Sequence, residues 1–155
     1  TDGVPSMERL KSLAYTSQFI QEVLRLYPPA WTVARNAVAD DEIMGYRIPA
    51  GSIVMVSPYF AHRLEEFWPD PLRFDPERFT PEAIAARHPF AYFPFSLGPR
   101  ICIGMQFSLY EARLVFAMLL RRFKVLSVGG GEVGARAQGT LRPDTALMVR
   151  RKPRQ

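Results

Sequence analysis

Two stretches of the chain carry apolar residues at helical spacing. From Met7 to Leu26 the apolar side chains form stripes on two sides, which predicts one long buried helix. The Pro28–Pro29 pair cannot continue a helix and ends it. From Ile103 to Arg122 a single apolar face is followed by two arginines, which suit a helix C-terminus.

The segment between these helices predicts short strands followed by an irregular meander. Two β-prone runs, Trp31–Val38 and Ser52–Val56, flank turn residues, a pattern typical of small antiparallel strands. Eight of the fourteen prolines lie from Pro58 to Pro99. This density excludes long helices and central strands, so we expect an ordered meander.

Beyond the second helix the pattern predicts more extended structure. Phe123–Val128 reads as a strand, the glycines at 129–131 as a turn, and Leu141–Val149 as a hairpin around "RPDT". The predicted fold class is therefore α+β and mainly helical, with two long helices, small antiparallel strands and a proline-rich meander.

Composition narrows the class of protein. The chain has 155 residues, 48% of them hydrophobic, which is typical of a soluble globular domain. Its apolar runs are shorter than a membrane span, and its single cysteine cannot form an internal disulfide. The opening "TDGVPSMERL" resembles neither a signal peptide nor a translation start. We therefore expect a piece of a longer chain, with a cytoplasmic location.

The charge pattern and the two histidines argue against a nucleic-acid site and a histidine metal site. The net charge is +5, but only the cluster from Arg150 to Arg154 is dense, and we interpret it as a solvated tail. A basic face with interleaved aromatic residues is missing, so we expect no nucleic-acid partner. His62 and His88 lack partners at metal-ligand spacing, so we expect neither to bind a metal.

The stretch "FPFSLGPRICIGMQF" contains the single cysteine, Cys102, just before the second predicted helix. A helix N-terminus carries free N–H groups and partial positive charge, which stabilise a thiolate. Gly98 and Gly104 let the backbone approach a flat or bulky group, and Arg100 is placed to bind an anion. Taken alone, Cys102 also fits a buried structural cysteine in a tight turn.

The spacing around Cys102 is more specific than the cysteine itself. Residues 95–104 read F-x-x-G-x-R-x-C-x-G. Other short motifs occur elsewhere in the chain: an E-x-x-R at Glu22 and Arg25, "AHR" at 61–63, "WPDP" at 68–71 and "PERF" at 76–79. Together they resemble the haem-binding signature and associated motifs of the cytochrome P-450 family. The resemblance extends from Met7 to about Lys152.

The resemblance implies a role for each residue of the cysteine motif. Cys102 would supply the thiolate that is the proximal axial ligand of the haem iron. Phe95 would shield the sulfur side of the ring, and Gly98 and Gly104 would let the backbone approach the macrocycle. Arg100 would pair with a haem propionate.

Further roles follow from the same resemblance. Arg35 is a second propionate candidate, with an exposed strand arginine as the alternative. Glu22 would bridge Arg25 and Arg78 in a structural triad that ties the first helix to the meander. We expect this triad to affect haem incorporation and not the chemical step.

The resemblance also places substrate contacts in two segments, one after the first helix and one near the C-terminus. The residues concerned are Ala30, Trp31, Thr32, Val33, Asp144 and Thr145. The apolar side chains among them suit a small apolar organic substrate.

The implied function is that of a haem–thiolate monooxygenase. Its cofactor would be haem b (iron protoporphyrin IX), and it would insert one atom of O2 into the substrate. Electrons would come from NAD(P)H through a ferredoxin or a flavoprotein reductase.

The family's distal helix, with its proton relay, has no counterpart in the sequence. We therefore expect residues 1–155 to be a single partial domain, the C-terminal haem-binding part. Three alternatives stay open: a non-catalytic haem-binding fragment, a remnant that binds no haem, and a family member with isomerase or peroxygenase chemistry.

Overall fold

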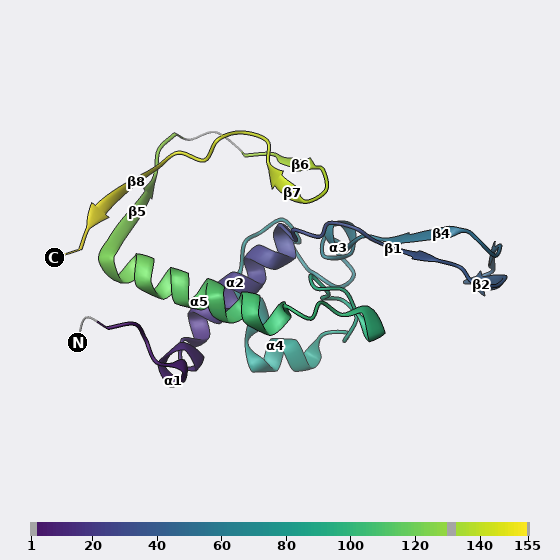
Figure 1. Cartoon of the computed structure of the whole chain (residues 1–155), viewed down its shortest axis with the longest axis horizontal. Coiled ribbons are helices and arrows are strands. Elements are labelled where there is room, and N and C mark those ends of the chain that lie inside the picture. The colour runs from purple at the N-terminus through teal and green to yellow at the C-terminus, as the bar shows by residue number, and fades with distance from the viewer. Residues whose placement is uncertain (1–2, 130–132, 155) are drawn as a thin grey trace.

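Two helices that pack against each other form the centre of the computed structural model, which describes residues 3–129 and 133–154 (Figure 1). They are α2 (Ala14–Leu26) and α5 (Met105–Arg122). The sequence pattern predicted where α2 ends and where α5 ends, and it placed the start of α5 two residues early.

The prediction of one helix from Met7 to Leu26 is wrong, because the chain breaks after α1 (Met7–Lys11). Ser12 caps α1, and its hydroxyl donates a hydrogen bond to the Arg9 carbonyl at 2.9 Å. A serine side chain that bonds to the preceding turn competes with the helical ladder. The break lets α1 contact α5 while α2 continues in another direction.

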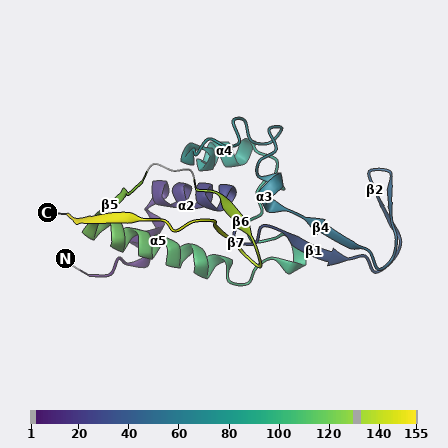
Figure 2. The ribbon, with the colours of Figure 1, turned by 90° about the horizontal axis from the view of Figure 1, so that it is seen from above.

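The strands expected after α2 form an arm that projects from the body of the molecule (Figures 1 and 2). β1 (Val33–Asn36) pairs antiparallel with β4 (Ile53–Val56), with Val33 opposite Val56. β2 (Asp41–Ile43) and β3 (Tyr46–Ile48) form a hairpin further along the arm. The predicted antiparallel pairing is confirmed.

The proline-rich meander consists of short helices joined by turns. These are α3 (Pro58–Ala61), η1 (Pro76–Phe79), α4 (Pro81–Ala86) and η2 (Gly98–Arg100). Each has proline in its first turn, where no N–H is needed. The first three are also capped by a side-chain oxygen, from Ser57, Asp75 and Thr80 respectively.

The strands of the C-terminal part pair differently from the prediction. β6 (Ala135–Ala137) and β7 (Leu141–Pro143) form a hairpin whose turn is at 138–140, so the hairpin predicted around "RPDT" is wrong. β8 (Val149–Pro153) pairs with β5 (Phe123–Ser127). The basic residues predicted as a tail are therefore mostly in an exposed strand. Two of the glycines predicted as a turn, 130 and 131, lie outside the described residues.

The described core is small and lies within the meander. Its centre is a cluster of Trp68, Phe79 and Ala91, with Tyr92 packed against it. By contrast, α5 leaves large apolar side chains exposed, such as Phe107 at 72%. The best-packed part of the chain is therefore the part that leads into the cysteine loop.

Candidate functional site

A buried ion pair links α2 to the meander. Glu22 and Arg25, both 0% exposed, are joined by a bidentate pair, with Arg25 Nε 2.7 Å from Oε2 and Nη2 2.9 Å from Oε1 of Glu22. Arg78 lies further away, with its Nε 3.8 Å from Glu22 Oε1. That Nε has no hydrogen-bond partner in the part of the chain that the structure describes. The sequence-predicted triad is therefore assembled, with its third member the most loosely held.

The remaining polar atoms of this pair hold the backbone of the meander. Arg25 donates hydrogen bonds to the carbonyl oxygens of His62, Pro71 and Arg73, at 2.8, 2.8 and 3.2 Å. The Asp75 N–H donates to Glu22 Oε1 at 2.8 Å. Buried charges are tolerated when every polar atom finds a partner. The pair thus fixes residues 62–75 against α2.

His62, which carried no role in the sequence-based interpretation, is fully buried at 0% exposure. Its Nε2 accepts a hydrogen bond from the Phe93 N–H at 3.0 Å, and its Nδ1 is 3.2 Å from the Arg25 carbonyl oxygen. Burial lowers the pKa of His62 to about 4, although the hydrogen bond to the Arg25 carbonyl acts in the opposite direction. His62 is therefore neutral at pH 7.

Three hydrogen bonds hold the segment Ala91–Phe93, which leads into the cysteine loop. One is the bond from Phe93 to His62. The Trp68 indole N–H donates to the Ala91 carbonyl at 3.2 Å, and the Tyr92 hydroxyl donates to the Gln21 carbonyl at 3.1 Å. Burial raises the pKa of Tyr92, so its hydroxyl stays protonated and remains a donor.

The cysteine loop runs from Phe93 to Gly104, and Gly104 is the N-cap of α5. The Cys102 N–H donates to the Phe95 carbonyl at 2.9 Å, which closes the loop. The loop turns through Ser96 and Gly98, both with positive φ, at 66° and 68°. Cys102 is exposed among the described residues.

Gly104 lies beside the Cys102 thiol. A Cβ built on Gly98 meets no atom within 4 Å, and one built on Gly104 meets only the Cys102 Sγ, at 3.8 Å. Gly98 is explained by its positive φ, but Gly104 has φ of −83°, which any residue adopts. The described residues therefore give no steric reason for a glycine at 104. A flat group seated against the sulfur supplies one, so the residues present fit a haem.

Two arginines lie on or beside the loop. Arg100, in η2, is exposed, and its side chain makes no hydrogen bond or ion pair with residues 3–129 or 133–154. Arg35, in β1, donates to the Ser96 hydroxyl at 3.1 Å and to the Ala34 carbonyl at 2.8 Å. The fold thus brings Arg35 to the cysteine loop from a position 61 residues earlier in the chain.

The first predicted substrate segment contacts the hairpin β6–β7, which precedes the second one in the chain. The Trp31 indole N–H donates to the Gln138 carbonyl at 2.8 Å, and the Leu141 N–H donates to the Pro29 carbonyl at 2.9 Å. Ala30, Asp144 and Thr145 are exposed, whereas Trp31, Thr32 and Val33 are half-buried. The hairpin β6–β7 therefore contacts the segment that follows α2.

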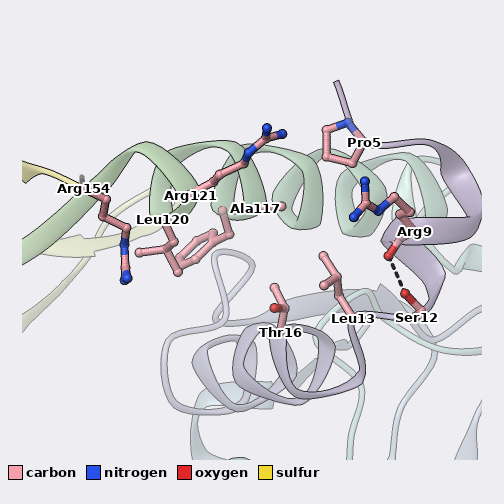
Figure 3. Close-up of a pocket in the computed structure, with 10 residues that line it drawn as sticks. Pro5, Arg9, Ser12, Leu13, Thr16, Ala117, Leu120, Arg121 and Arg154 are labelled. Atoms are coloured by element: carbon pink, nitrogen blue, oxygen red, sulfur yellow. Dashed lines mark hydrogen bonds between the residues drawn. The ribbon is translucent and has the colours of Figure 1, made fainter. Parts of the chain in front are cut away.

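A cavity of about 710 Å³ lies elsewhere, between α5 and the N-terminal helices (Figure 3). Leu13 and Thr16 face Ala117 and Leu120 across it. None of its lining residues belongs to the cysteine loop, so it is not the predicted site.

Among the described residues, no group of three or more histidine, cysteine, aspartate or glutamate side chains is arranged to hold a metal ion. Over the same residues, no helix is both long enough and apolar enough to cross a membrane.

Comparison with known proteins agrees with this geometry. The family model described as cytochrome P-450 matches residues 1–151. The chain belongs to the cytochrome P-450 family. Among curated relatives, it is 42% identical over 155 residues to the probable cytochrome P-450 4aa1 of Drosophila melanogaster, covering 99% of this chain and 30% of that protein. It is 39% identical to human cytochrome P-450 4V2, again covering 99% of this chain and 30% of the relative.

Solved P-450 structures share the fold. The crystal structure of the cytochrome P-450DA haem domain superposes with a TM-score of 0.93 at 31% identity, covering 100% of this chain and 34% of that one. The predicted family and fold class are thus confirmed. The chain spans about 30% of the length of these curated P-450 relatives.

Proposed function

We propose that the full-length P-450 protein is a haem–thiolate monooxygenase that inserts one atom of O2 into an apolar organic substrate. The observation that carries this proposal is the exposed Cys102 just before α5, with Gly104 beside its thiol. Family membership supports the same activity. When bound, haem b supplies oxygen activation, and a thiolate ligand donates electron density that favours O–O cleavage.

Cys102 is the proposed axial ligand. The carbonyl of Phe95 accepts the Cys102 N–H at 2.9 Å, which fixes the Cys102 backbone. The start of α5, three residues later at Met105, adds free N–H groups and partial positive charge that stabilise a thiolate. The Phe95 ring, half-buried beside the cysteine, is the proposed shield on the sulfur side.

Arg100 and Arg35 are the proposed partners of the haem propionates. A guanidinium binds a carboxylate through two parallel hydrogen bonds, which orients a flat cofactor as well as holding it. Arg100 is exposed and has no partner in the described parts of the chain, so its donors are available. Arg35 is tied to Ser96 and so moves with the loop.

The triad of Glu22, Arg25 and Arg78 has a proposed structural role. It supports the meander, and through His62 it reaches the segment that leads into the cysteine loop. Loss of the triad is therefore expected to reduce haem incorporation and not the rate of the chemical step.

For the substrate and the redox partner we propose a chemical class and no individual molecule. The segment Ala30–Val33 and the region at Asp144 and Thr145 are the proposed substrate contacts, and the first of them is hydrogen-bonded to the hairpin β6–β7 through Trp31. Electrons would come from NAD(P)H through a ferredoxin or a flavoprotein reductase. The net charge of +5 suits an acidic partner.

The proposed activity is tested with full-length protein, haem, a redox partner system and NADPH. Under 18O2, a panel of fatty acids, steroids and aromatic hydrocarbons is analysed by mass spectrometry. One labelled oxygen atom per product molecule, with NADPH consumed, supports a monooxygenase. A product formed without O2 or NADPH indicates isomerase-type chemistry and contradicts the proposal. Bound haem with no product from any substrate supports a non-catalytic haem protein.

A further inference from the structure

His62 occupies a position between the buried ion pair and the cysteine loop. Its carbonyl oxygen accepts a hydrogen bond from Arg25 Nη1 at 2.8 Å, and its ring Nδ1 lies 3.2 Å from the Arg25 carbonyl. On the other side of the ring, Nε2 accepts from the Phe93 N–H at 3.0 Å. One residue thus contacts both the C-terminal turn of α2 and the segment that leads into the loop.

The partners of the ring fix its tautomer. A backbone N–H only donates, so Nε2 must carry the lone pair that accepts the Phe93 hydrogen. The proton therefore resides on Nδ1 and is donated to the Arg25 carbonyl, which only accepts. The ring is also enclosed by aromatic groups, with Tyr92 stacked at 5.3 Å and Phe93 and Trp68 edge-on at 5.2 and 6.2 Å.

A short stretch of backbone connects the hydrogen bond between His62 and Phe93 to Cys102. Two residues beyond Phe93, the carbonyl of Phe95 accepts the Cys102 N–H at 2.9 Å. Between these two residues the chain turns, with the Ser96 N–H donating to the Phe93 carbonyl at 3.1 Å, and Pro94 restricts the backbone of this turn. A shift of the Phe93 amide is therefore transmitted to the carbonyl that fixes the Cys102 backbone.

We propose that His62 is the positioning residue of the cysteine loop: its Nε2 holds the Phe93 N–H and thereby sets where Cys102 lies relative to α2. This inference rests on the proposed haem-ligand role of Cys102 for its functional meaning. A purely space-filling histidine would need neither nitrogen, whereas here both are hydrogen-bonded and the ring is fully buried.

Two isosteric substitutions separate the two hydrogen bonds. His62→Gln places a carboxamide oxygen near the position of Nε2, so it keeps the acceptor for Phe93. His62→Asn places an amide N–H near the position of Nδ1, so it keeps the donor to Arg25 and leaves the Phe93 N–H without a partner. Leu10→Ala, which truncates a buried side chain in α1, is the control for general destabilisation.

The test uses full-length protein and follows two signals for each variant. Hydrogen–deuterium exchange of peptides covering 93–104 reports the order of the loop, with or without haem. The fraction of reduced, CO-bound protein with a red-shifted Soret band reports thiolate ligation. For His62→Asn we expect roughly tenfold faster exchange, because a buried N–H loses its acceptor, together with a loss of the red-shifted fraction. For His62→Gln we expect both signals to stay near wild type.

The proposal is overturned if the Asn and Gln variants behave alike, or if Leu10→Ala changes exchange at 93–104 as much as His62→Asn does. A third measurement needs no variant: 15N NMR of the wild-type histidines must show His62 protonated on Nδ1, and a proton on Nε2 contradicts the proposal. If wild type gives no red-shifted band, the proposed haem role fails, while the exchange and NMR results still decide the role of His62.

Discussion

Substituting Glu22 with alanine removes the acceptor at the centre of the buried ion pair. The carboxylate accepts two bonds from Arg25, at 2.7 and 2.9 Å, and one from the Asp75 N–H at 2.8 Å. Breaking a fully buried pair by deleting one partner costs about 3–5 kcal/mol. Arg25 keeps three carbonyl partners, which moderates the loss. We therefore expect the free energy of unfolding to fall by about 3 kcal/mol.

The assay is urea unfolding of the full-length protein, followed by circular dichroism and by haem content. The matched control is Arg47→Gln, which breaks an ion pair with Asp40 whose side chains are 78% and 58% exposed. Exposed pairs contribute little, so we expect no measurable change in the control. A Glu22→Ala protein as stable as the control would refute the reasoning.

The same variants test what Arg25 does beyond the ion pair. Apolar replacement of both members of a buried pair is often neutral. Here the double variant Glu22→Met/Arg25→Leu would leave the carbonyls of His62, Pro71 and Arg73 without their donor. We expect it to remain less stable than wild type. Full recovery of stability would mean that these carbonyl contacts contribute nothing.

Three further predictions concern His62, Arg100 and Gly98. The pKa of His62 is about 4 in the fold against 6.5 ordinarily, so the unfolded chain binds the proton first. Stability should fall by about 3 kcal/mol as pH drops from 6.5 to 4, and His62→Gln should flatten that part of a urea-unfolding pH series. Arg100→Gln should speed haem loss, measured by transfer to an acceptor protein, whereas Arg136→Gln on β6 should not; equal rates contradict the propionate role. Gly98→Ala, at φ 68°, should lower stability by about 1 kcal/mol through backbone strain alone, and an unchanged urea midpoint would contradict this.

The pattern of apolar, proline and turn residues predicted those helix ends and strands that neighbouring residues determine. The end of α2 before Pro28, the end of α5 at Arg122 and the antiparallel arm all follow from periodicity, proline and turn residues. The break at Ser12 escaped the pattern because the apolar stripe continues across it. The partner of β5 also escaped, because pairing with β8 depends on contacts between distant segments and not on either strand's own residues.

Some features of the candidate site could likewise be predicted from local sequence, whereas others required the fold. The spacing of residues 95–104 identified the cysteine loop, since five positions within ten residues form a specific motif. The role of His62 could not be predicted, because a lone histidine is informative only when its neighbours are known. The sequence did contain the "AHR" motif around His62, but the motif indicated no chemistry for the histidine. The contact of Arg35 with Ser96 likewise required the fold.

The central claim is that Cys102 supplies a thiolate to a bound haem, and a carbon-monoxide difference spectrum tests it most directly. Full-length protein and its Cys102→Ser variant are loaded with haem, reduced and exposed to carbon monoxide. We expect a red-shifted Soret band in wild type that is absent from Cys102→Ser. A band that persists unchanged in the variant, or no band in a haem-loaded wild type, would contradict it.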